Sequence, residues 1–342
     1  MTAMQKIRIS FGSAAILKLE SALMETPPTT CYLMTASTMK CLGNCAFFFF
    51  FRDSRPEDNR NLSRIQWPEY RWNTFLNHLE KLYHSNSQLK FQRICLQALN
   101  YPHFYSDVKK IITTIHSYIP NVPISAALPP ISGTQMKELK EKGLDIICFA
   151  LDACNADLFH QIKGKGINGP YQWKKHLQYL ETALGIFGKK KVSTHFIVGL
   201  GETEFEMIAQ LLDTIQKGIN PGIFFFTPVK GTPMKAIARK PIKQFRHIQI
   251  ARYLLLENLD NFSTFVFDDE GKLSYIQALS ETKLWKIINK EIAFYTAGCP
   301  NCNRPFYTSR PSEEQDGYPR PLTMEEKQKI YHELKSIIDT TV

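Results

Sequence analysis

Short apolar runs alternate with amphipathic segments from residue 30 onward. Six runs rich in β-branched and aromatic residues are predicted strands: residues 30–35, 93–99, 123–128, 145–151, 192–198 and 222–229. The part from 146 to 151 is apolar at every position, which is typical of a parallel strand with both faces covered. The segments between the strands are predicted helices, and Gly143, Gly188 and Gly218 are predicted to end three of them.

Two of the predicted helices, over residues 105–118 and 202–217, have an apolar face at helical spacing. Its residues are Val108, Ile111, Ile112 and Ile115 in the first helix and Phe205, Ile208, Leu212 and Ile215 in the second. We expect both faces to pack on the sheet.

Alternating strands and helices predict an α/β fold with a parallel sheet, either open and doubly wound or closed toward a barrel. We divide the chain into an N-terminal segment (1–27), a core (28–238) and a C-terminal extension (239–342). The extension shows helices and no strand pattern, and its last helix is predicted to begin at the capping box Thr323-x-x-Glu326. Functional groups are expected at the carboxyl ends of the strands.

The composition and net charge of the chain limit the kinds of function that it can have. With 44% hydrophobic and 22% charged residues, the 342-residue chain is typical of a globular protein. Its net charge of +10 favours an acidic partner, but the basic residues are scattered, which does not favour nucleic acid. No apolar run approaches the roughly 18 residues of a membrane span, and no secretion signal is evident. We therefore expect a cytoplasmic protein without a membrane partner, whose eight cysteines are metal ligands or buried thiols.

Two pairs of cysteines are spaced for metal binding. Cys41 and Cys45 share the loop after the first predicted strand, where three thiolates can hold an iron–sulfur cluster and leave one iron open. Cys299 and Cys302 form a Cys-x2-Cys knuckle, which suits half of a zinc site, a redox pair or part of a second cluster. Spacing alone does not decide among these.

Seven separated motifs resemble the radical S-adenosylmethionine (SAM) superfamily and, within it, the two-component lipoyl synthases of archaea and some bacteria. They lie at residues 32–35, 40–45, 92–101, 151–153, 169–171, 192–203 and 298–305. The resemblance implies a partial (β/α)6 TIM-type barrel of the radical SAM type with a helical C-terminal extension. It also implies a transferase that inserts sulfur into a protein-bound octanoyl chain, in lipoyl cofactor biosynthesis.

The same resemblance implies cofactors and partners. The cofactors are a 4Fe-4S cluster with SAM and a second iron–sulfur cluster as sulfur donor. The implied metal ligands are Cys41, Cys45, Cys299 and Cys302, with Cys95 and Ser309 as further candidates. The candidate cofactor-binding residues are Phe47, Gln97, Asp152, Gly199, Gly201 and Glu202. The partners are an acidic lipoyl or octanoyl carrier protein and a homologous second radical SAM subunit.

The sequence departs from the superfamily pattern at Phe48. The signature Cys-x3-Cys-x2-Cys would place its third cysteine there, and a phenyl ring cannot bind iron. Cys31 is not expected to replace it, because it lies at the far end of the first predicted strand and is better explained as a buried residue. Two alternatives stand beside the lipoyl synthase: a non-catalytic barrel that acts as a scaffold, which Phe48 favours, and a tRNA methylthiotransferase-like enzyme, which would use the same core. His195 is expected to be a core residue.

Overall fold

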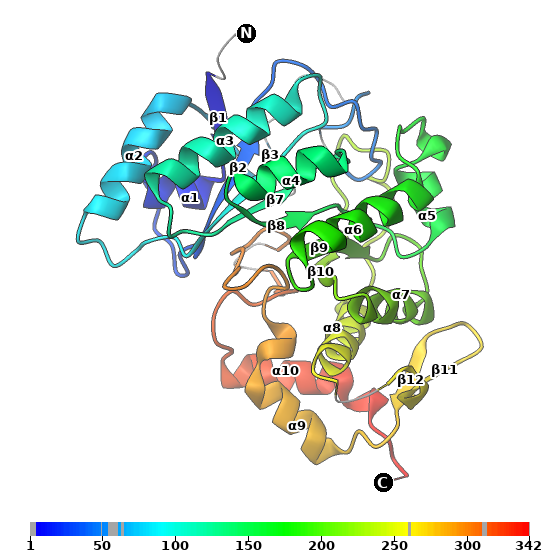
Figure 1. Ribbon diagram of the computed structural model, residues 1–342. Coiled ribbons are helices and arrows are strands. Elements are labelled where there is room, and N and C mark those ends of the chain that lie inside the picture. The colour runs from blue at the N-terminus through cyan, green and yellow to red at the C-terminus, as the bar shows by residue number, and fades with distance from the viewer. Residues whose placement is uncertain are drawn as a thin grey trace.

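A mostly parallel, eight-stranded sheet lies at the centre of the structure, a computed structural model that describes residues 5–48, 50–53, 61–62, 65–258, 261–309 and 313–341 (Figure 1). In spatial order its strands are β10 (Asn220–Phe225), β9 (Val192–Val198), β8 (Leu144–Cys148), β7 (Ile124–Ala127), β6 (Arg93–Gln97), β2 (Thr30–Thr35), β1 (Lys6–Ile9) and β5 (Glu69–Arg71). The strands from β10 to β2 are parallel, whereas β1 is antiparallel to both β2 and β5. All six predicted strands are present: β2 and β9 have the predicted ends, and the ends of the other four are shifted by a few residues.

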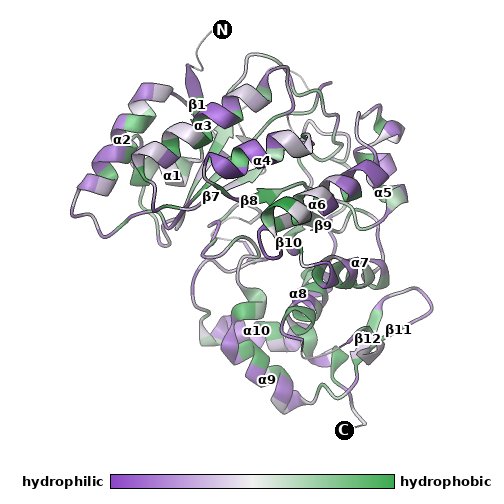
Figure 2. Ribbon diagram, viewed as in Figure 1, coloured by the Kyte–Doolittle hydropathy of each residue, from purple (hydrophilic) through white to green (hydrophobic). Residues whose placement is uncertain are grey.

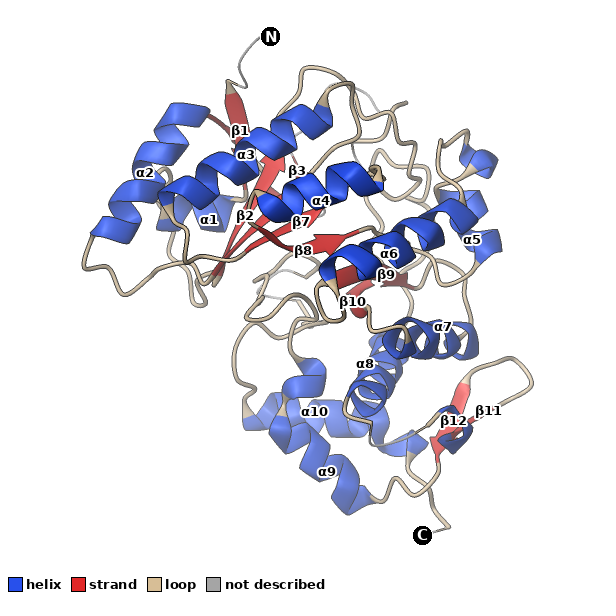
Figure 3. Cartoon of the chain, in the orientation of Figure 1, coloured by secondary structure: helices blue, strands red, loops and turns tan. Residues whose placement is uncertain are grey.

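Helices connect the parallel strands and cover the sheet (Figure 3). Those that follow β6 to β9 are α3 (Phe104–Tyr118), α4 (Gly133–Glu141), α5 (Ala156–Ile162), α6 (Trp173–Phe187) and α7 (Glu204–Gln216). The other described α-helices are α1 (Phe11–Ile16), α2 (Trp72–His84), α8 (Ile242–Leu256), α9 (Glu281–Lys290) and α10 (Met324–Leu334). Short 3-10 helices lie at Lys165–Ile167, Phe262–Thr264, Ile292–Phe294 and Lys335–Ile337. The predicted α/β fold, a partial TIM-type barrel with helical elements, is confirmed.

The predicted apolar face is the buried face on α3 but only partly so on α7. On α3 the predicted residues Val108, Ile111, Ile112 and Ile115 are all buried. On α7 the prediction was partly wrong, because the buried face is centred on Met207, Ile208 and Leu211. Green and purple stripes along the helices in Figure 2 show this division of each helix into apolar and polar faces.

Phe205 shows why the predicted face of α7 was displaced. It is 43% exposed and does not face the sheet. Its ring instead lies 5.4 Å from that of Phe262 and 5.2 Å from that of Phe267, in the C-terminal extension. Helix α7 therefore makes two apolar contacts, one with the sheet and one with the extension, and the residues of both contribute to the apolar pattern in the sequence.

The C-terminal extension contains a strand pair that the sequence analysis did not predict. β11 (Phe265–Phe267) and β12 (Leu273–Ile276) pair antiparallel, and another short pair, β3 (Asn61–Leu62) with β4 (Ile65–Gln66), precedes β5. Strands of two to four residues are too short to show a clear alternation. The predicted capping box of α10 is confirmed: Thr323 accepts a hydrogen bond from the backbone N–H of Glu326, and the Glu326 side chain accepts one from that of Thr323. Among the described residues, no helix is both long and apolar enough to cross a membrane.

The barrel is open on one side. Within the described residues, β10 pairs with β9 alone and makes no ladder with β1 or β2. In Figure 1, α8, α9, α10 and the β11–β12 pair lie together beyond the β10 side of the sheet. The segment from 298 to 307 returns from this extension to the opening, and the chemistry described next depends on it.

Candidate functional site

A cavity of about 190 Å³ lies where the parallel strands end, and we call it the loop cavity. Five of the predicted site residues line it: Cys41, Cys45, Phe47, Gln97 and Asp152. They come from the loop after β2, the end of β6 and the turn after β8. The expectation that functional groups gather at the carboxyl ends of parallel strands explains this convergence.

The two cysteines of this loop, Cys41 and Cys45, form the loop pair. The loop that carries them is fixed to its surroundings, because the backbone N–H of Ala46 donates to the carbonyl of Ile162 at 2.8 Å. Burial raises the pKa of both thiols, that of Cys45 to about 12. Both side chains are therefore protonated thiols at neutral pH until a metal displaces the protons.

Phe48 lines the same cavity at the third position of the Cys-x3-Cys-x2-Cys spacing. Its N–H donates to the carbonyl of Cys45 at 3.3 Å, and its ring lies 5.6 Å from that of Phe50. The side chain required as the third iron ligand is thus an aromatic ring in the cavity wall. The loop supplies two thiols, and these residues do not fit a cluster held by three thiolates.

A buried ion pair lies beside the loop pair. Lys163 Nζ donates to Asp152 Oδ2 at 2.6 Å and to the carbonyl of Ala150 at 2.5 Å, and the two charged side chains are only 8% and 12% exposed. Burial lowers the pKa of Lys163, but the charge of Asp152 and its hydrogen bond to Lys163 outweigh burial and raise the pKa overall. Asp152 is held in a left-handed backbone conformation (φ 65°). Its predicted role in cofactor binding stays a prediction, and Lys163 is a cavity residue that the sequence analysis missed.

Four more cysteines gather inside the barrel, and we call them the inner set: Cys95, Cys148, Cys299 and Cys302. Burial raises the pKa of Cys95 well above its usual value, and charge interactions with the other three thiols raise it further. Burial also raises the pKa of Cys148 to about 12, with a smaller contribution from Cys299. The Cys302 N–H donates to the Cys299 carbonyl at 3.0 Å, which closes the knuckle into a turn. Two strands and the C-terminal knuckle thus bring four thiols to one region.

The knuckle is held between the two sides of the open barrel. On one side, the backbone N–H of Thr29 donates to Asn303 Oδ1 at 3.0 Å, just before β2. On the other side, Asn220 Nδ2 in β10 donates to the carbonyl of Gly298 at 3.0 Å. These contacts position Cys299 and Cys302 without any metal.

Arg304 supplies positive charge to the inner set. Its guanidinium lies 3.9 Å from the ring centre of Phe224, and its charge lowers the pKa of Cys95 and Cys299 against the opposing effect of burial. Arg304 Nε is buried and has no hydrogen-bond partner in the described part of the chain. Thiols with a neighbouring cation and an unpaired buried donor are the residue types that an anionic iron–sulfur cluster takes. Among the described residues, no three His, Cys, Asp or Glu side chains are arranged to hold a single metal ion.

The loop cavity and the inner set are joined by His195. This residue was expected in the core, but it lines the loop cavity, and its Nε2 lies 3.6 Å from Cys148 Sγ. Burial, and then the charge of Arg304, lowers the pKa of His195 to about 4. A neutral imidazole therefore lies between the two groups of cysteines and is in contact with Cys148.

The predicted residues Gly199, Gly201 and Glu202 lie away from the loop cavity. The Glu202 carboxylate is buried and accepts hydrogen bonds from the backbone N–H groups of Gly199 (2.5 Å), Leu200 (2.9 Å) and Gly201 (3.1 Å). The two glycines have φ of 103° and 134°, a backbone region that favours glycine. The carboxylate therefore orders its own loop, and a role of these residues in cofactor binding stays a prediction.

Two other candidate ligands, Cys31 and Ser309, make contacts elsewhere in the structure. Cys31 is fully buried, and its thiol interacts with Ser13 in the main core, so it does not complete the loop pair, as expected. Ser309 Oγ donates to Gln315 Oε1 at 3.0 Å. Of the two side chains considered as extra ligands of the knuckle, Cys95 lies with it, and Cys148 is the ligand candidate that the sequence analysis missed.

Comparison with known proteins supports the fold. No protein-family model matches the chain. An uncharacterized protein of Methanocaldococcus jannaschii is 29% identical over 124 residues, which cover 35% of this chain and 31% of that protein. The structure of methylornithine synthase (PylB) is 12% identical and covers 72% of this chain and 67% of that one, with a TM-score of 0.52. The FeFe-hydrogenase maturase HydG from Carboxydothermus hydrogenoformans is 17% identical and covers 64% and 49%, with a TM-score of 0.50.

The matches are partial, because the chain spans 31% of the curated relative and 49% of the hydrogenase maturase. At sequence identities of 12% and 17%, the structural likeness identifies an architecture and leaves the reaction open. The two solved structures are radical SAM enzymes. The chain therefore has the partial α/β barrel fold of the radical SAM enzymes.

Proposed function

We propose that the chain takes part in sulfur insertion into an octanoyl chain attached to a protein, as the subunit that holds the sulfur source. The contact between Cys148 and His195 carries this proposal, because it joins the inner set to the loop cavity over 3.6 Å. Enzymes of barrel architecture do their chemistry at the carboxyl ends of the strands. A sulfur source directly behind such a cavity suits transfer of sulfur to a substrate bound there.

The inner set is proposed to hold the second iron–sulfur cluster. Four thiolates match the ligand number of a cluster in which each thiolate binds a different iron. The cation of Arg304 favours the thiolate forms, and its unpaired Nε is a donor that can face a cluster sulfur. Bound there, the cluster would supply sulfide. The protein's part is to hold the ligands on β6, β8 and the knuckle and to keep water from them.

Cleavage of SAM is assigned to a partner. The loop pair with Phe48 does not fit a three-thiolate cluster, so we propose that a homologous second subunit with a complete loop supplies the radical. The acidic carrier protein remains the proposed substrate partner, because the net charge of +10 complements it. We expect the complex to act where a protein-bound acyl chain is available in the cytoplasm.

Phe48 also favours a second candidate function, a scaffold without metal. In that case the inner set would be four buried thiols, and the barrel would bind the carrier or the sister subunit only. The two candidates differ in one measurable property, because a sulfur source requires iron and acid-labile sulfide in the unaltered chain.

The test is anaerobic reconstitution of the unaltered chain and of two variants, Phe48→Cys and Phe50→Cys. We expect about four iron atoms per unaltered chain, in the inner set, and background formation of 5'-deoxyadenosine from SAM. Phe48→Cys should add about four more iron atoms and start SAM cleavage, whereas Phe50→Cys, in the same aromatic run, should do neither. An unaltered chain that binds no iron would support the scaffold and contradict the sulfur-source function.

A further inference from the structure

A groove of about 1140 Å³ runs along the open side of the barrel, and we call it the side groove. One wall is the chain around β1 and β2, from Ser10 to Gly12 and from residue 22 to residue 28. The other wall is the segment 227–230 after β10. The side groove therefore lies where the sheet fails to close, between its β2 side and its β10 edge.

The inner end of the side groove lies against the inner set. Tyr32 and Tyr307 line the groove with ring centres 5.1 Å apart. Tyr32 Oη contacts Cys302 Sγ at 3.3 Å and accepts a hydrogen bond from the Arg304 N–H at 2.9 Å. A ligand that reaches Tyr32 is thus one side chain away from a proposed cluster ligand.

The side groove also adjoins the loop cavity. Tyr32 and Met34 lie two residues apart on β2 and belong to one apolar cluster, so they point to the same face of the strand. Tyr32 lines the side groove and Met34 lines the loop cavity. Two residues of strand span about 7 Å, the length of a few carbon–carbon bonds. The end of the side groove at Tyr32 and the wall of the loop cavity at Met34 therefore lie close together along one strand.

The lining of the side groove suits a hydrocarbon. Most of its side chains are apolar, among them Phe11, Leu23, Met24, Ile65, Val229 and Phe306. Its charged residues are Glu25 and Lys230. The groove exceeds the roughly 300–1,000 Å³ of a pocket for one small molecule. It has room for an alkyl chain together with the linker that joins the chain to a larger partner.

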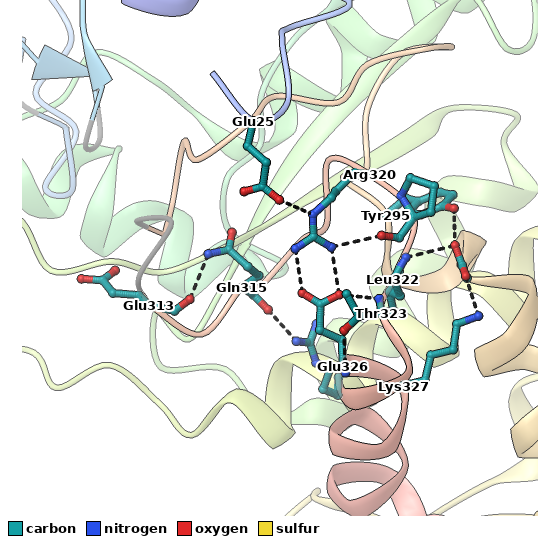
Figure 4. A network of polar contacts seen from close by, with 12 residues as sticks. Glu25, Tyr295, Glu313, Gln315, Arg320, Leu322, Thr323, Glu326 and Lys327 are labelled. Carbon is teal, nitrogen blue, oxygen red and sulfur yellow. Dashed lines mark hydrogen bonds and ion pairs between the residues drawn. The ribbon is translucent and has the colours of Figure 1, made fainter. Parts of the chain in front are cut away.

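One wall of the side groove is fastened to the C-terminal extension. Figure 4 shows Arg320 between Glu25 and Glu326: its Nε donates to Glu25 at 3.0 Å, and its two terminal nitrogens donate to Glu326 at 2.9 and 3.1 Å. Asn303 Nδ2 donates to the Pro27 carbonyl at 3.0 Å at the base of the same wall. These contacts hold the wall in place before any ligand binds.

We infer that the side groove is the binding site for the acyl chain, which a carrier protein presents on a lysine and which enters from the open side of the barrel to Tyr32. This inference rests on the proposed function and adds to it the route of the substrate and the residues that receive it. A linear saturated acyl amide is the ligand class that fits an apolar groove ending at a sulfur source.

Binding can be measured without any iron. The probe is a fluorescein-labelled acidic peptide that carries one Nε-octanoyl-lysine, and the readout is fluorescence anisotropy with the full, iron-free chain. Two variants fill the groove: Val229→Trp and Gly12→Leu. A Cβ atom at Gly12 would meet Pro28 and Met24 at ordinary contact distances of 3.5 and 3.6 Å, so the first atom of the new side chain is accommodated there. Ala156→Trp, at an exposed position on α5, is the matched control.

We expect both filled-groove variants to bind the probe at least about tenfold more weakly, and the control to stay within about twofold. The same peptide with an unmodified lysine should not bind. The inference is wrong if the filled variants bind like the unaltered chain, or if the unmodified peptide or free octanoate binds as well as the probe. Melting curves of all variants confirm that they are folded.

A second measurement does not depend on variants. A peptide whose octanoyl chain ends in a diazirine should crosslink to residues 22–28, 227–230 or 305–307, as located by mass spectrometry. Labelling elsewhere contradicts the inference. Because the binding assays use iron-free protein, a chain that binds the probe yet takes up no iron would refute only the sulfur-source function. A chain with a full inner cluster and no probe binding would refute only the groove.

Discussion

The loop pair and the inner set differ in how the chain supplies their ligands. The loop pair comes from one loop, so a single position, Phe48, removes the third ligand. The inner set comes from β6, β8 and the knuckle, which are far apart in sequence and are brought together by the fold. Its ligands are also held by contacts that serve the barrel itself, such as Thr29 with Asn303. The fold therefore keeps the four thiols of the inner set together, whereas the loop pair has no third cysteine at position 48.

The two groups also differ in their electrostatic surroundings. The cation nearest the loop pair, Lys163, is already paired with Asp152. The cation of the inner set, Arg304, keeps a buried Nε without a hydrogen-bond partner in the described structure. The inner set therefore has a buried donor available to a ligand, whereas the cation beside the loop pair is already paired, and this difference supports the proposed cluster site.

The largest expected effect is on iron content. Replacing Cys299 and Cys302 together with Ala should remove nearly all iron from the reconstituted chain, because two of four ligands are lost. Replacing Cys41 and Cys45 together should leave the iron content unchanged. Both are measured as iron and acid-labile sulfide per chain, with the absorbance near 400 nm as a check. The comparison between the two regions fails if the loop-pair variant loses as much iron as the knuckle variant.

The second effect concerns the charged pair at the loop cavity. Lys163→Met should lower the free energy of unfolding by about 3–5 kcal/mol, because it leaves the buried Asp152 carboxylate without its partner. The double variant Lys163→Met with Asp152→Asn should recover much of that loss. Urea denaturation of the single and double variants measures both. Equal stability of the single variant and the unaltered chain would show that the pair is hydrated.

Much of the fold was predictable, because its signals are local. The six parallel strands and the buried face of α3 follow from apolar spacing within each segment. The face of α7 was predicted only in part, because Phe205 contacts the C-terminal extension rather than the sheet. The β11–β12 pair was missed because its strands are only three and four residues long. The spacing of apolar residues indicates which face of a helix or strand is buried, but it does not indicate which other element packs on that face.

The candidate site was predictable only in part, for the same reason. Cys41 and Cys45 are close in sequence, so their spacing reveals them. Cys148 joins the inner set only through the fold, because Cys95 and the knuckle lie far from it in sequence. Lys163 also had no local signal, because its pairing with Asp152 is a tertiary contact.

A smaller effect on stability is expected from removing the hydroxyl of Tyr32, and it should be absent when the hydroxyl of Tyr253 is removed. Tyr32→Phe should cost about 1–3 kcal/mol of stability, because the partly buried N–H of Arg304 loses its acceptor. Tyr253→Phe on α8 is the control: its hydroxyl is also buried but has no hydrogen-bond partner within the described residues, so its removal should be neutral or stabilising. Thermal melting of both variants measures the difference. Equal losses would mean that the Tyr32 hydroxyl does not hold the knuckle.

The smallest expected effect is at the base of the inner set. Arg93 Nη1 donates to Ser125 at 2.8 Å and to Asp145 at 3.0 Å, and Ser125 in turn contacts the Cys299 thiol. Asp145 also pairs with Lys191. Asp145→Asn should therefore cost less than about 1 kcal/mol at neutral pH, since the carboxylate is partly exposed to solvent.

The pH dependence of that cost has a defined sign. Burial raises the pKa of Asp145, but the hydrogen bonds from Lys191 and Arg93 outweigh it and hold the pKa below its usual value. A folded-state pKa below the unfolded one stabilises the fold above about pH 4, and the gain is lost as the pH falls through the folded value. The melting temperatures of the unaltered chain and Asp145→Asn should thus differ at pH 6 and converge at acid pH. Because the contacts of β2 and β10 with the knuckle remain, the iron content should stay unchanged. A loss of iron in this variant would show that the inner set depends on this exposed charge, and would remove the contrast with the loop pair.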